Sequence, residues 1–251
     1  NLAMEEMTNN ELVIHGYVLR SVDYQENDAI VTVLYESGVI SFKAKGIKKL
    51  TSKNRSSCLL YAESEFVLEK SKNDNYILIK GNLISSNFNL YSSIENMTCL
   101  GLIGGAILTF LDENFSSEIY ENFSLLIKGI NNNFDVFTLT CINLTKIVIE
   151  TGYGLNTSCC IRCQKKDKIV AINFFDGGFV CLRCLNKNED VEDTIYLKSI
   201  RYVFMVTQKD YFHYVLERKI CIRIIKELMK YIQTEFGYNK LNFYDIFLTL
   251  Y

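Results

Sequence analysis

The amino-acid sequence predicts a multidomain protein of α and β structure, in which a small N-terminal β-barrel precedes an all-α domain with a cysteine-rich insertion. Three observations predict this fold class. The first third of the 251 residues alternates apolar and polar side chains, the later part has apolar side chains at helical spacing, and five of the nine cysteines fall between Cys159 and Cys184. We place the barrel at residues 8–86, the helical domain at 87–251 and the insertion at about 156–188.

Five short runs in the first third have the composition and alternation of β-strands. They are residues 12–20, 29–35, 39–45, 65–70 and 76–84. Glu36-Ser37-Gly38 reads as the tight turn of a hairpin between the second and third runs. In the third run, Phe42 and Ala44 share one face while Lys43 and Lys45 share the other. The pattern fits a small closed barrel such as the OB-fold, and it equally allows an SH3-like barrel.

The period changes to that of helices from about residue 87. Apolar residues recur at helical spacing in 91–111, 116–129, 134–151, 198–207 and 211–236, and a short helix ends the chain. Gly152 is the predicted stop of the third helix. Gly101, Gly104 and Gly105 lie within the first helix, where we expect them to allow close helix packing.

Bulk properties exclude some classes of protein and partner. The net charge of −2 gives no overall attraction to a polyanion, so the distribution of charge decides. No apolar run is long enough to cross a bilayer, and no basic region leads into an apolar one as in a signal peptide. We therefore expect a cytoplasmic protein without a membrane partner.

Two C-x-x-C pairs, Cys160 with Cys163 and Cys181 with Cys184, have the spacing of a zinc ribbon or knuckle. A two-residue spacer lets both thiolates of a pair face one ion, and two pairs complete a closed tetrahedron around a structural Zn²⁺. Asp176-Gly177-Gly178 reads as the turn that brings the second pair back. Cys159 leaves the register open, because it is an alternative to Cys160 as a ligand.

Other readings of the cysteines remain. The four thiols of the pairs could be reduced and metal-free, or one pair could be a redox C-x-x-C, which needs a thiol of lowered pKa at a helix start. The isolated cysteines are predicted to be small buried hydrophobes. These are Cys58, Cys99, Cys141 and Cys221.

A basic stretch follows the second strand, with no acidic residue between Val39 and Leu60. Such a cluster attracts phosphates through counterion release. Phe42 and Tyr24 are candidates for base stacking, with a core or rim position as the alternative. The alternative interpretation of the basic stretch is a solvated loop. The candidate DNA-binding residues are Arg20, Lys43, Lys45, Lys48, Lys49, Lys53 and Arg55.

An ordered set of short segments spans nearly the whole chain. It comprises GYVLR at 16–20, DYQEND at 23–28, VTVL at 31–34, Gly38, AKGIKK at 44–49, TGYGL at 151–155, the two cysteine pairs around Asp176-Gly177-Gly178, and the terminal helices at 228–247. This set resembles the bacterial recombination mediator family RecO. The family often has arginine where Lys48 and Lys49 stand, and lysine keeps the charge but loses the bidentate phosphate geometry.

The resemblance implies an N-terminal OB-fold β-barrel followed by an all-α domain, which in many members carries a four-cysteine zinc knuckle. It implies a non-enzymatic DNA repair and recombination protein, at the nucleoid, that binds single- and double-stranded DNA and anneals complementary strands. The implied partners are RecR, the C-terminal tail of single-strand-binding protein and, in some members, RecF. With them the family displaces single-strand-binding protein and loads RecA. The matching basic segment implies DNA contact by the seven cations as a patch.

Two rival functions belong to other classes. One is a zinc-ribbon protein-interaction module in transcription, with the barrel as its docking surface, and the other is a thiol oxidoreductase. Against an enzyme in general, the sequence has no phosphate-binding glycine motif, no nucleophile elbow and no histidine–acid cluster.

Overall fold

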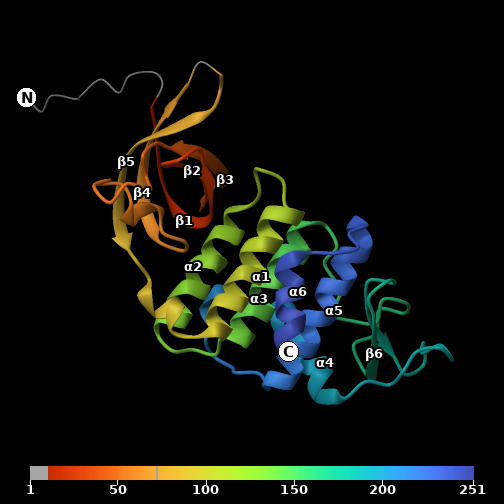
Figure 1. Cartoon of the computed structure of the whole chain (residues 1–251). Helices are drawn as coiled ribbons and strands as arrows, with labels where there is room; N and C mark the ends of the chain where they lie inside the picture. The colour runs from red at the N-terminus through yellow and green to blue at the C-terminus, as the bar shows by residue number, and fades with distance from the viewer. Residues whose placement is uncertain (1–10, 72) are drawn as a thin grey trace, which may run out of the picture. The chain divides into compact units, whose positions relative to one another are not determined.

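The computed structural model describes residues 11–71 and 73–251, which form two compact units. The first unit runs to Phe88 and includes the return segment Asp112–Tyr120, and the second contains Asn89–Leu111 and Glu121–Tyr251. The domain limits 8–86 and 87–251 stay a prediction, and residues 8–10 lie outside the described part of the chain. Figure 1 shows strands in the first unit and mainly helices in the second.

The first unit is a closed five-stranded barrel with the strand order β1-β2-β3-β5-β4. The strands are β1 (Glu11–Tyr24), β2 (Asp28–Tyr35), β3 (Gly38–Ala44), β4 (Glu63–Lys70) and β5 (Tyr76–Ser85). Neighbouring strands are antiparallel except β3 and β5, whose parallel pairing closes the barrel. This is OB-fold topology, so the SH3-like alternative is wrong. β1 also continues past the predicted end at Arg20.

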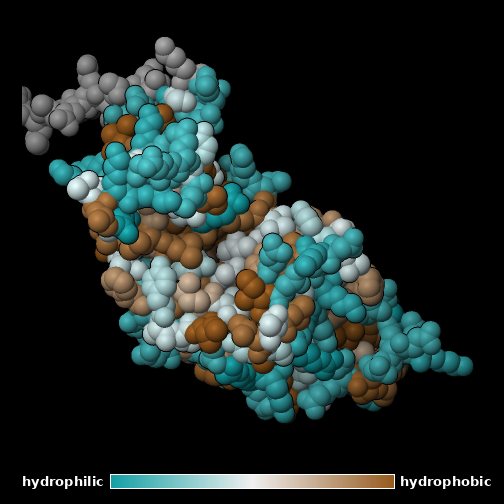
Figure 2. Space-filling view, viewed as in Figure 1, coloured by the Kyte–Doolittle hydropathy of each residue, from teal (hydrophilic) through white to brown (hydrophobic). Residues whose placement is uncertain are grey.

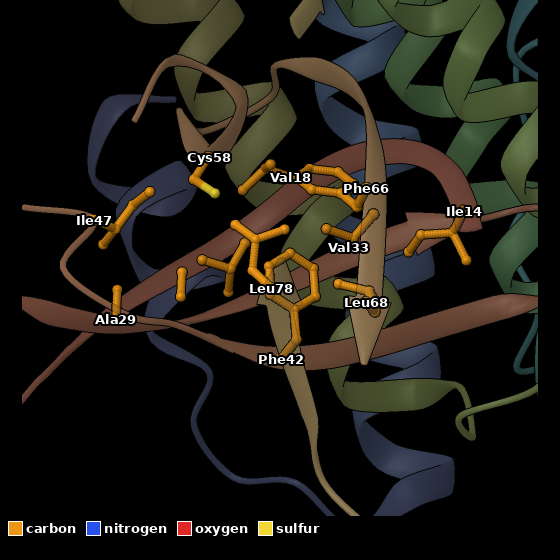
Figure 3. Close-up of a cluster of buried hydrophobic side chains, with 12 residues drawn as sticks. Ile14, Val18, Ala29, Val33, Phe42, Ile47, Cys58, Phe66, Leu68 and Leu78 are labelled. Carbon is orange, nitrogen blue, oxygen red and sulfur yellow. The ribbon is translucent and has the colours of Figure 1, made fainter. Parts of the chain in front are cut away.

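The barrel interior is filled by apolar side chains that alternate along the strands (Figure 3). Phe42 of β3 packs against Phe66 of β4 with ring centroids 5.2 Å apart. Phe42 is therefore a core residue and is removed from the candidates for base stacking, whereas the Tyr24 side chain is 44% exposed. The core consists of Ile14, Val18, Ala29, Val31, Val33, Phe42, Ala44, Ile47, Cys58, Phe66, Leu68 and Leu78.

Gly38 ends the β2–β3 turn where the chain meets the return segment. Its φ is +139°, and a Cβ there would lie 2.0 Å from the carbonyl oxygen of Glu113. The next residue, Val39, donates its N–H to that same oxygen at 2.9 Å. Only glycine allows this close approach, which explains the predicted turn residue.

The second unit is built on six helices, the second of which begins in the return segment. They are α1 (Ile94–Phe110), α2 (Ser117–Asn131), α3 (Val136–Glu150), α4 (Thr194–Met205), α5 (Arg218–Phe236) and α6 (Asn242–Leu250). Short 3-10 turns occur at Ser56–Cys58 in the first unit, at Phe88–Ser92 where the chain passes to the second unit, and at Gln208–Asp210 in the second unit. α3 is buried along nearly its whole length and packs against α1, α4 and α5. Side-chain N-caps begin α1, α3 and α4, at Ser93, Asp135 and Asp193 respectively.

Most predicted helices are present, but the long one predicted at 211–236 begins only at Arg218. The reason lies in tertiary contacts. Tyr211 is buried, and its hydroxyl contacts the Asn143 amide and donates to the Asn122 carbonyl oxygen at 3.2 Å. The N–H of Leu216 is bound by the Thr138 hydroxyl at 3.0 Å. These bonds hold the segment before α5 in a non-helical path.

The glycine predictions have mixed outcomes. Gly152 follows α3 with φ at +84°, which confirms the predicted stop. At Gly105 a Cβ would lie 2.4 Å from the Phe243 ring, so close packing is confirmed there. At Gly101 a Cβ would meet nothing within 4 Å, so close packing is wrong for that residue. Among the described residues, no helix combines the length and apolarity needed to cross a bilayer.

Candidate metal centre and nucleic-acid interface

The four paired cysteines converge on one point in the second unit. The Sγ atoms of Cys160, Cys163, Cys181 and Cys184 all lie within 4.8 Å of one another, and those of Cys163 and Cys181 are 3.6 Å apart. Tetrahedral thiolate ligands with metal–sulfur bonds of about 2.3 Å are separated by about 3.8 Å. The donor set and spacing therefore fit a single structural ion of the zinc type.

A small hairpin brings the two pairs together. β6 (Ile169–Asn173) and β7 (Gly178–Cys181) pair antiparallel through the predicted turn, so the hairpin prediction is confirmed. The backbone of Ile161, inside the first C-x-x-C, donates to the carbonyl oxygen of Phe179 at 2.9 Å. At Gly178 a Cβ would lie 2.2 Å from the Asn156 carbonyl oxygen, so a glycine is needed where the chain enters β7. Figure 1 labels β6 in this hairpin.

Cys159 lies outside the cluster. Its Sγ is 3.7 Å from Nδ2 of Asn156 and 3.9 Å from Oε1 of Gln164. The structure brings Cys160 to the other three thiols, as the C-x-x-C spacing favours. The four isolated cysteines are buried, which confirms their predicted place in the cores.

The surroundings of the cluster shift the pKa values of two of its thiols in opposite directions. Burial opposes ionisation of Cys160, but hydrogen bonds from the backbone of Cys181 and of its own turn outweigh it and lower the pKa to about 6. Hydrogen bonding to the Cys163 thiol, together with burial, raises the pKa of Cys184 to about 12. Four thiolates this close need a cation to replace their protons, as a divalent metal does.

An ion-pair staple holds the two C-x-x-C turns together. Arg162 donates from Nη1 to the Cys184 carbonyl oxygen at 2.7 Å and to the carboxylate of Glu189 at 2.7 Å, and from Nη2 to Asp176 at 2.5 Å. The Glu189 carboxylate also accepts from the Asn173 amide and from the Asn186 backbone. This role of Glu189 was not predicted, since in the sequence it is one of several acids in a polar connector. The charge of Arg162 is neutralised by the carboxylates of Asp176 and Glu189.

The staple has a defined pH dependence. Arg162, Asn173 and the Asn186 N–H lower the pKa of Glu189 to about 2. Because the folded pKa lies below the ordinary value near 4.5, this stabilisation is complete above that value. It is lost as the pH falls from there toward 2.

Glu189→Gln is expected to loosen the cysteine segment by roughly 1–3 kcal/mol, because the ion pair between the Glu189 carboxylate and Arg162 is replaced by hydrogen bonds to an uncharged amide. The measurement is the rate at which a chelating dye removes the metal from the native protein at neutral pH. Asp190→Asn is the matched control, since Asp190 is exposed and makes no ion pair among the described residues. Equal rates of metal release in the two variants would show that the Arg162–Glu189 ion pair does not stabilise the cysteine segment.

The basic residues of the first unit begin on the outer face of the barrel. Arg20 of β1 pairs across to Thr32 of β2, and Thr32 pairs with Ser41 of β3. Lys43 lies two residues after Ser41 on the same face. Arg20 and Lys43 thus project from the face of β1, β2 and β3, which is where OB-folds bind oligonucleotides.

Two of the seven predicted cations are paired with carboxylates. Lys43 lies 2.9 Å from Asp28, and Lys48 lies 2.6 Å from Asp23. The backbone N–H of Gly46 and the ammonium of Lys43 lower the pKa of Asp28, so this acid is charged at neutral pH. Within the described residues the other five cations make no ion pair: Arg20, Lys45, Lys49, Lys53 and Arg55.

Two depressions lie beside these cations. One, of about 350 Å³, is lined by Tyr24, Ile30, Ser41, Phe42, Lys43, Ser71, Asn75, Tyr76 and Ile77. The other lies at the β1–β2 turn and is lined by Gln25, Glu26, Asn27, Asp28, Lys45, Gly46 and Lys49. The Lys43 ammonium lies 4.6 Å from the Tyr24 ring centroid, so a cation and an exposed aromatic ring occur together at the first depression.

Lys53 and Arg55 lie elsewhere on the barrel. The side chain of Asn54 between them binds the backbone of Ile79 and Gly81, at 3.5 and 3.1 Å. This places the pair beside β5, whereas the chain around Lys48 is bound to the β1–β2 turn through Asn27. The five predicted cations that follow β3 therefore divide into two groups along one loop.

Similarity to known proteins extends over most of the chain. The family model described as "Recombination protein O N terminal" matches residues 7–87, and "Recombination protein O C terminal" matches residues 92–198. DNA repair protein RecO of Mesoplasma florum is 32% identical over 239 residues, 91% of this chain and 87% of that protein. DNA repair protein RecO of Caldicellulosiruptor bescii is 27% identical over 87% of this chain and 90% of that protein. The chain therefore belongs to the RecO family of DNA repair proteins.

Proposed function

We propose that this protein is a non-enzymatic recombination mediator that binds single- and double-stranded DNA through its barrel and anneals complementary strands. The observation that carries the proposal is the outer face of β1, β2 and β3. It combines Arg20, which makes no ion pair among the described residues, and Lys43, which pairs with Asp28, with the exposed Tyr24 ring, next to a depression that lies on the OB-fold ligand face. Cations attract the phosphates, and the ring offers a stacking surface to a base.

The chemistry of the metal centre agrees with a structural role. Four cysteine thiolates complete the tetrahedron of a Zn²⁺ ion, so no position remains for water or substrate. The residues that would hold the ion are Cys160, Cys163, Cys181 and Cys184. When bound, the ion fixes the two C-x-x-C turns against each other, which is a folding contribution rather than catalysis.

Family membership also supports a proposal for the wider pathway. We propose that the protein works with RecR and, where the organism has it, RecF, and that it engages the C-terminal tail of single-strand-binding protein. In this role it displaces that protein from DNA and loads RecA. We propose that it acts on the chromosome, in the bacterial cytoplasm at the nucleoid.

The double variant Lys45→Glu/Lys49→Glu is expected to weaken binding of single-stranded DNA and to reduce its salt dependence. Both side chains are exposed and lack an ion pair within the described residues. Each lost phosphate contact lowers the slope of log affinity against log salt by roughly 0.7, so the slope should fall by about 1.4. The measurement is fluorescence anisotropy with a labelled thymidine oligonucleotide at several salt concentrations.

The control is Lys209→Glu/Lys240→Glu, which makes the same change in net charge at exposed positions of the second unit. If both double variants lose affinity equally, net charge and not the barrel face explains the binding. If the wild-type protein has no salt-sensitive affinity for DNA but captures a transcription protein, the interaction-module alternative replaces the proposal.

A further inference from the structure

A second group of cations lies in the other unit, where the cysteine segment meets α4. A depression of about 210 Å³ is lined by Lys166, Lys168, Ile169, Phe179, Thr194, Leu197, Lys198 and Arg201. We call this depression the basic cleft. Four of its eight lining residues are cationic and none is acidic, so its lining carries a net positive charge.

Arg201 forms a fixed part of the basic cleft. Its Nε donates to the Thr157 carbonyl oxygen at 2.9 Å, and its guanidinium lies 5.3 Å from the ring centroid of the buried Phe179. The remaining N–H groups have no partner among the described residues. A guanidinium held in one orientation presents a planar fork of donors, the geometry that matches a phosphate.

Three exposed lysines surround that guanidinium. Lys166 and Lys168 lie in the loop after Cys163, and Lys198 lies three residues before Arg201 on α4, so both project from the same side of the helix. None of the three makes an ion pair with a described residue. The nearby Asp193 is engaged as the N-cap of α4, where it accepts from the Ile195 N–H at 2.6 Å.

Two separate segments create the basic cleft, and neither does so alone. Lys166, Lys168 and Phe179 come from the cysteine segment, while Lys198 and Arg201 come from α4, which packs against β6 (Figure 1). In the view of Figure 2 the loops beside β6 carry mainly hydrophilic side chains, in keeping with a surface that faces water. The folding of the cysteine segment against α4 therefore brings the four cations of the basic cleft together.

We propose that the basic cleft binds the phosphate backbone of a second nucleic-acid strand. The inference rests on the proposed function, which supplies a first strand at the barrel. The guanidinium of Arg201 and the three surrounding lysines offer positive charge and hydrogen-bond donors to phosphate oxygens. Of the three apolar lining residues, Phe179 and Leu197 are 1% and 6% exposed and Ile169 is half-buried, so the exposed side chains of the cleft are mainly its lysines. Two strand-binding surfaces on one chain let it hold both partners of an annealing reaction.

The test counts binding sites on the full, metal-loaded chain with an oligonucleotide of six thymidines, using calorimetry at low salt. The cleft variant is Lys166→Glu/Lys168→Glu/Lys198→Glu, and the barrel variant is Lys45→Glu/Lys49→Glu. We expect two sites in the wild type, one in each variant and none in the combined variant. We also expect the cleft variant to lose strand annealing while it keeps salt-sensitive binding at the barrel.

The outcomes separate the two proposals. A cleft variant that keeps the wild-type site count and annealing rate overturns the basic cleft and leaves the barrel proposal standing. A barrel variant that binds like wild type, beside a cleft variant that binds nothing, overturns the barrel proposal and keeps the cleft. Competition by hexaglutamate as strong as that by the oligonucleotide reassigns the cleft to acidic peptides. Unchanged metal content in the cleft variant confirms that it is folded.

Discussion

Cys160→Ser is expected to release the metal ion and unfold the cysteine segment, whereas Cys159→Ser is expected to retain both. The two residues are adjacent in sequence, but only Cys160 has its Sγ within 4.8 Å of the other three thiols. Binding of a structural zinc ion contributes roughly 10–16 kcal/mol of apparent free energy, far more than a short hairpin gains from its own packing. This is the largest effect that a single substitution should have on the protein.

The measurement is metal content per chain by mass spectrometry, paired with limited proteolysis of residues 156–188. Cys159→Ser is a close control, because it makes the same chemical change one residue away in the same loop. The expected result is one ion per chain in the wild type and in Cys159→Ser, with loss of the ion and faster cleavage between β6 and β7 in Cys160→Ser alone. Equal metal content in the two variants would show that the register is wrong.

Phe66→Ala is expected to destabilise the barrel by about 3–5 kcal/mol, because it leaves a cavity in a closed core. Phe66 is fully buried and its ring packs against that of Phe42. Typical domains unfold at a cost of about 5–15 kcal/mol, so this single change removes a large part of the stability. DNA affinity at the barrel should fall with it, since the outer face depends on the strands beneath it.

The measurement is denaturant-induced unfolding followed by circular dichroism, with Phe66→Leu and Leu50→Ala as comparisons. The leucine fills much of the same volume and should cost less. Leu50 is 88% exposed in the same unit, so its truncation should change the stability by less than about 0.5 kcal/mol. A similar loss in Phe66→Ala and Leu50→Ala would contradict the assigned core.

The spacing of apolar residues and the chemistry of individual residues were enough to predict much of the fold from the sequence. The five strands, most of the helices and the hairpin between the cysteine pairs follow from local patterns, because strands and helices impose different spacings on apolar residues. The meeting of Cys160 with its three partners also follows from local sequence, since only two residues separate the cysteines of each pair. The family resemblance came from an ordered set of such local segments, and the family models bear it out.

Tertiary structure alone decided features that depend on residues far apart in the chain. Tyr211 interrupts a helical pattern because its hydroxyl finds partners on other helices. The sequence predicted that the basic stretch forms one charged patch. In the structure, Asp28 and Asp23 neutralise Lys43 and Lys48. Asn54 binds β5 and so places its neighbours Lys53 and Arg55 beside that strand. Charge in a sequence is counted along the chain, whereas neutralisation depends on distance in space.

The same contrast applies to the cysteine region. Spacing determined which thiols meet, since a C-x-x-C turn closes over four residues. Only the folded chain decided what surrounds them: Glu189 reaches back 27 residues to bind Arg162, and Arg201 of α4 crosses to Thr157. These contacts turn one arginine into an internal staple and leave the other facing a basic cleft, because a side chain's role depends on the partners that long-range packing brings within hydrogen-bond distance.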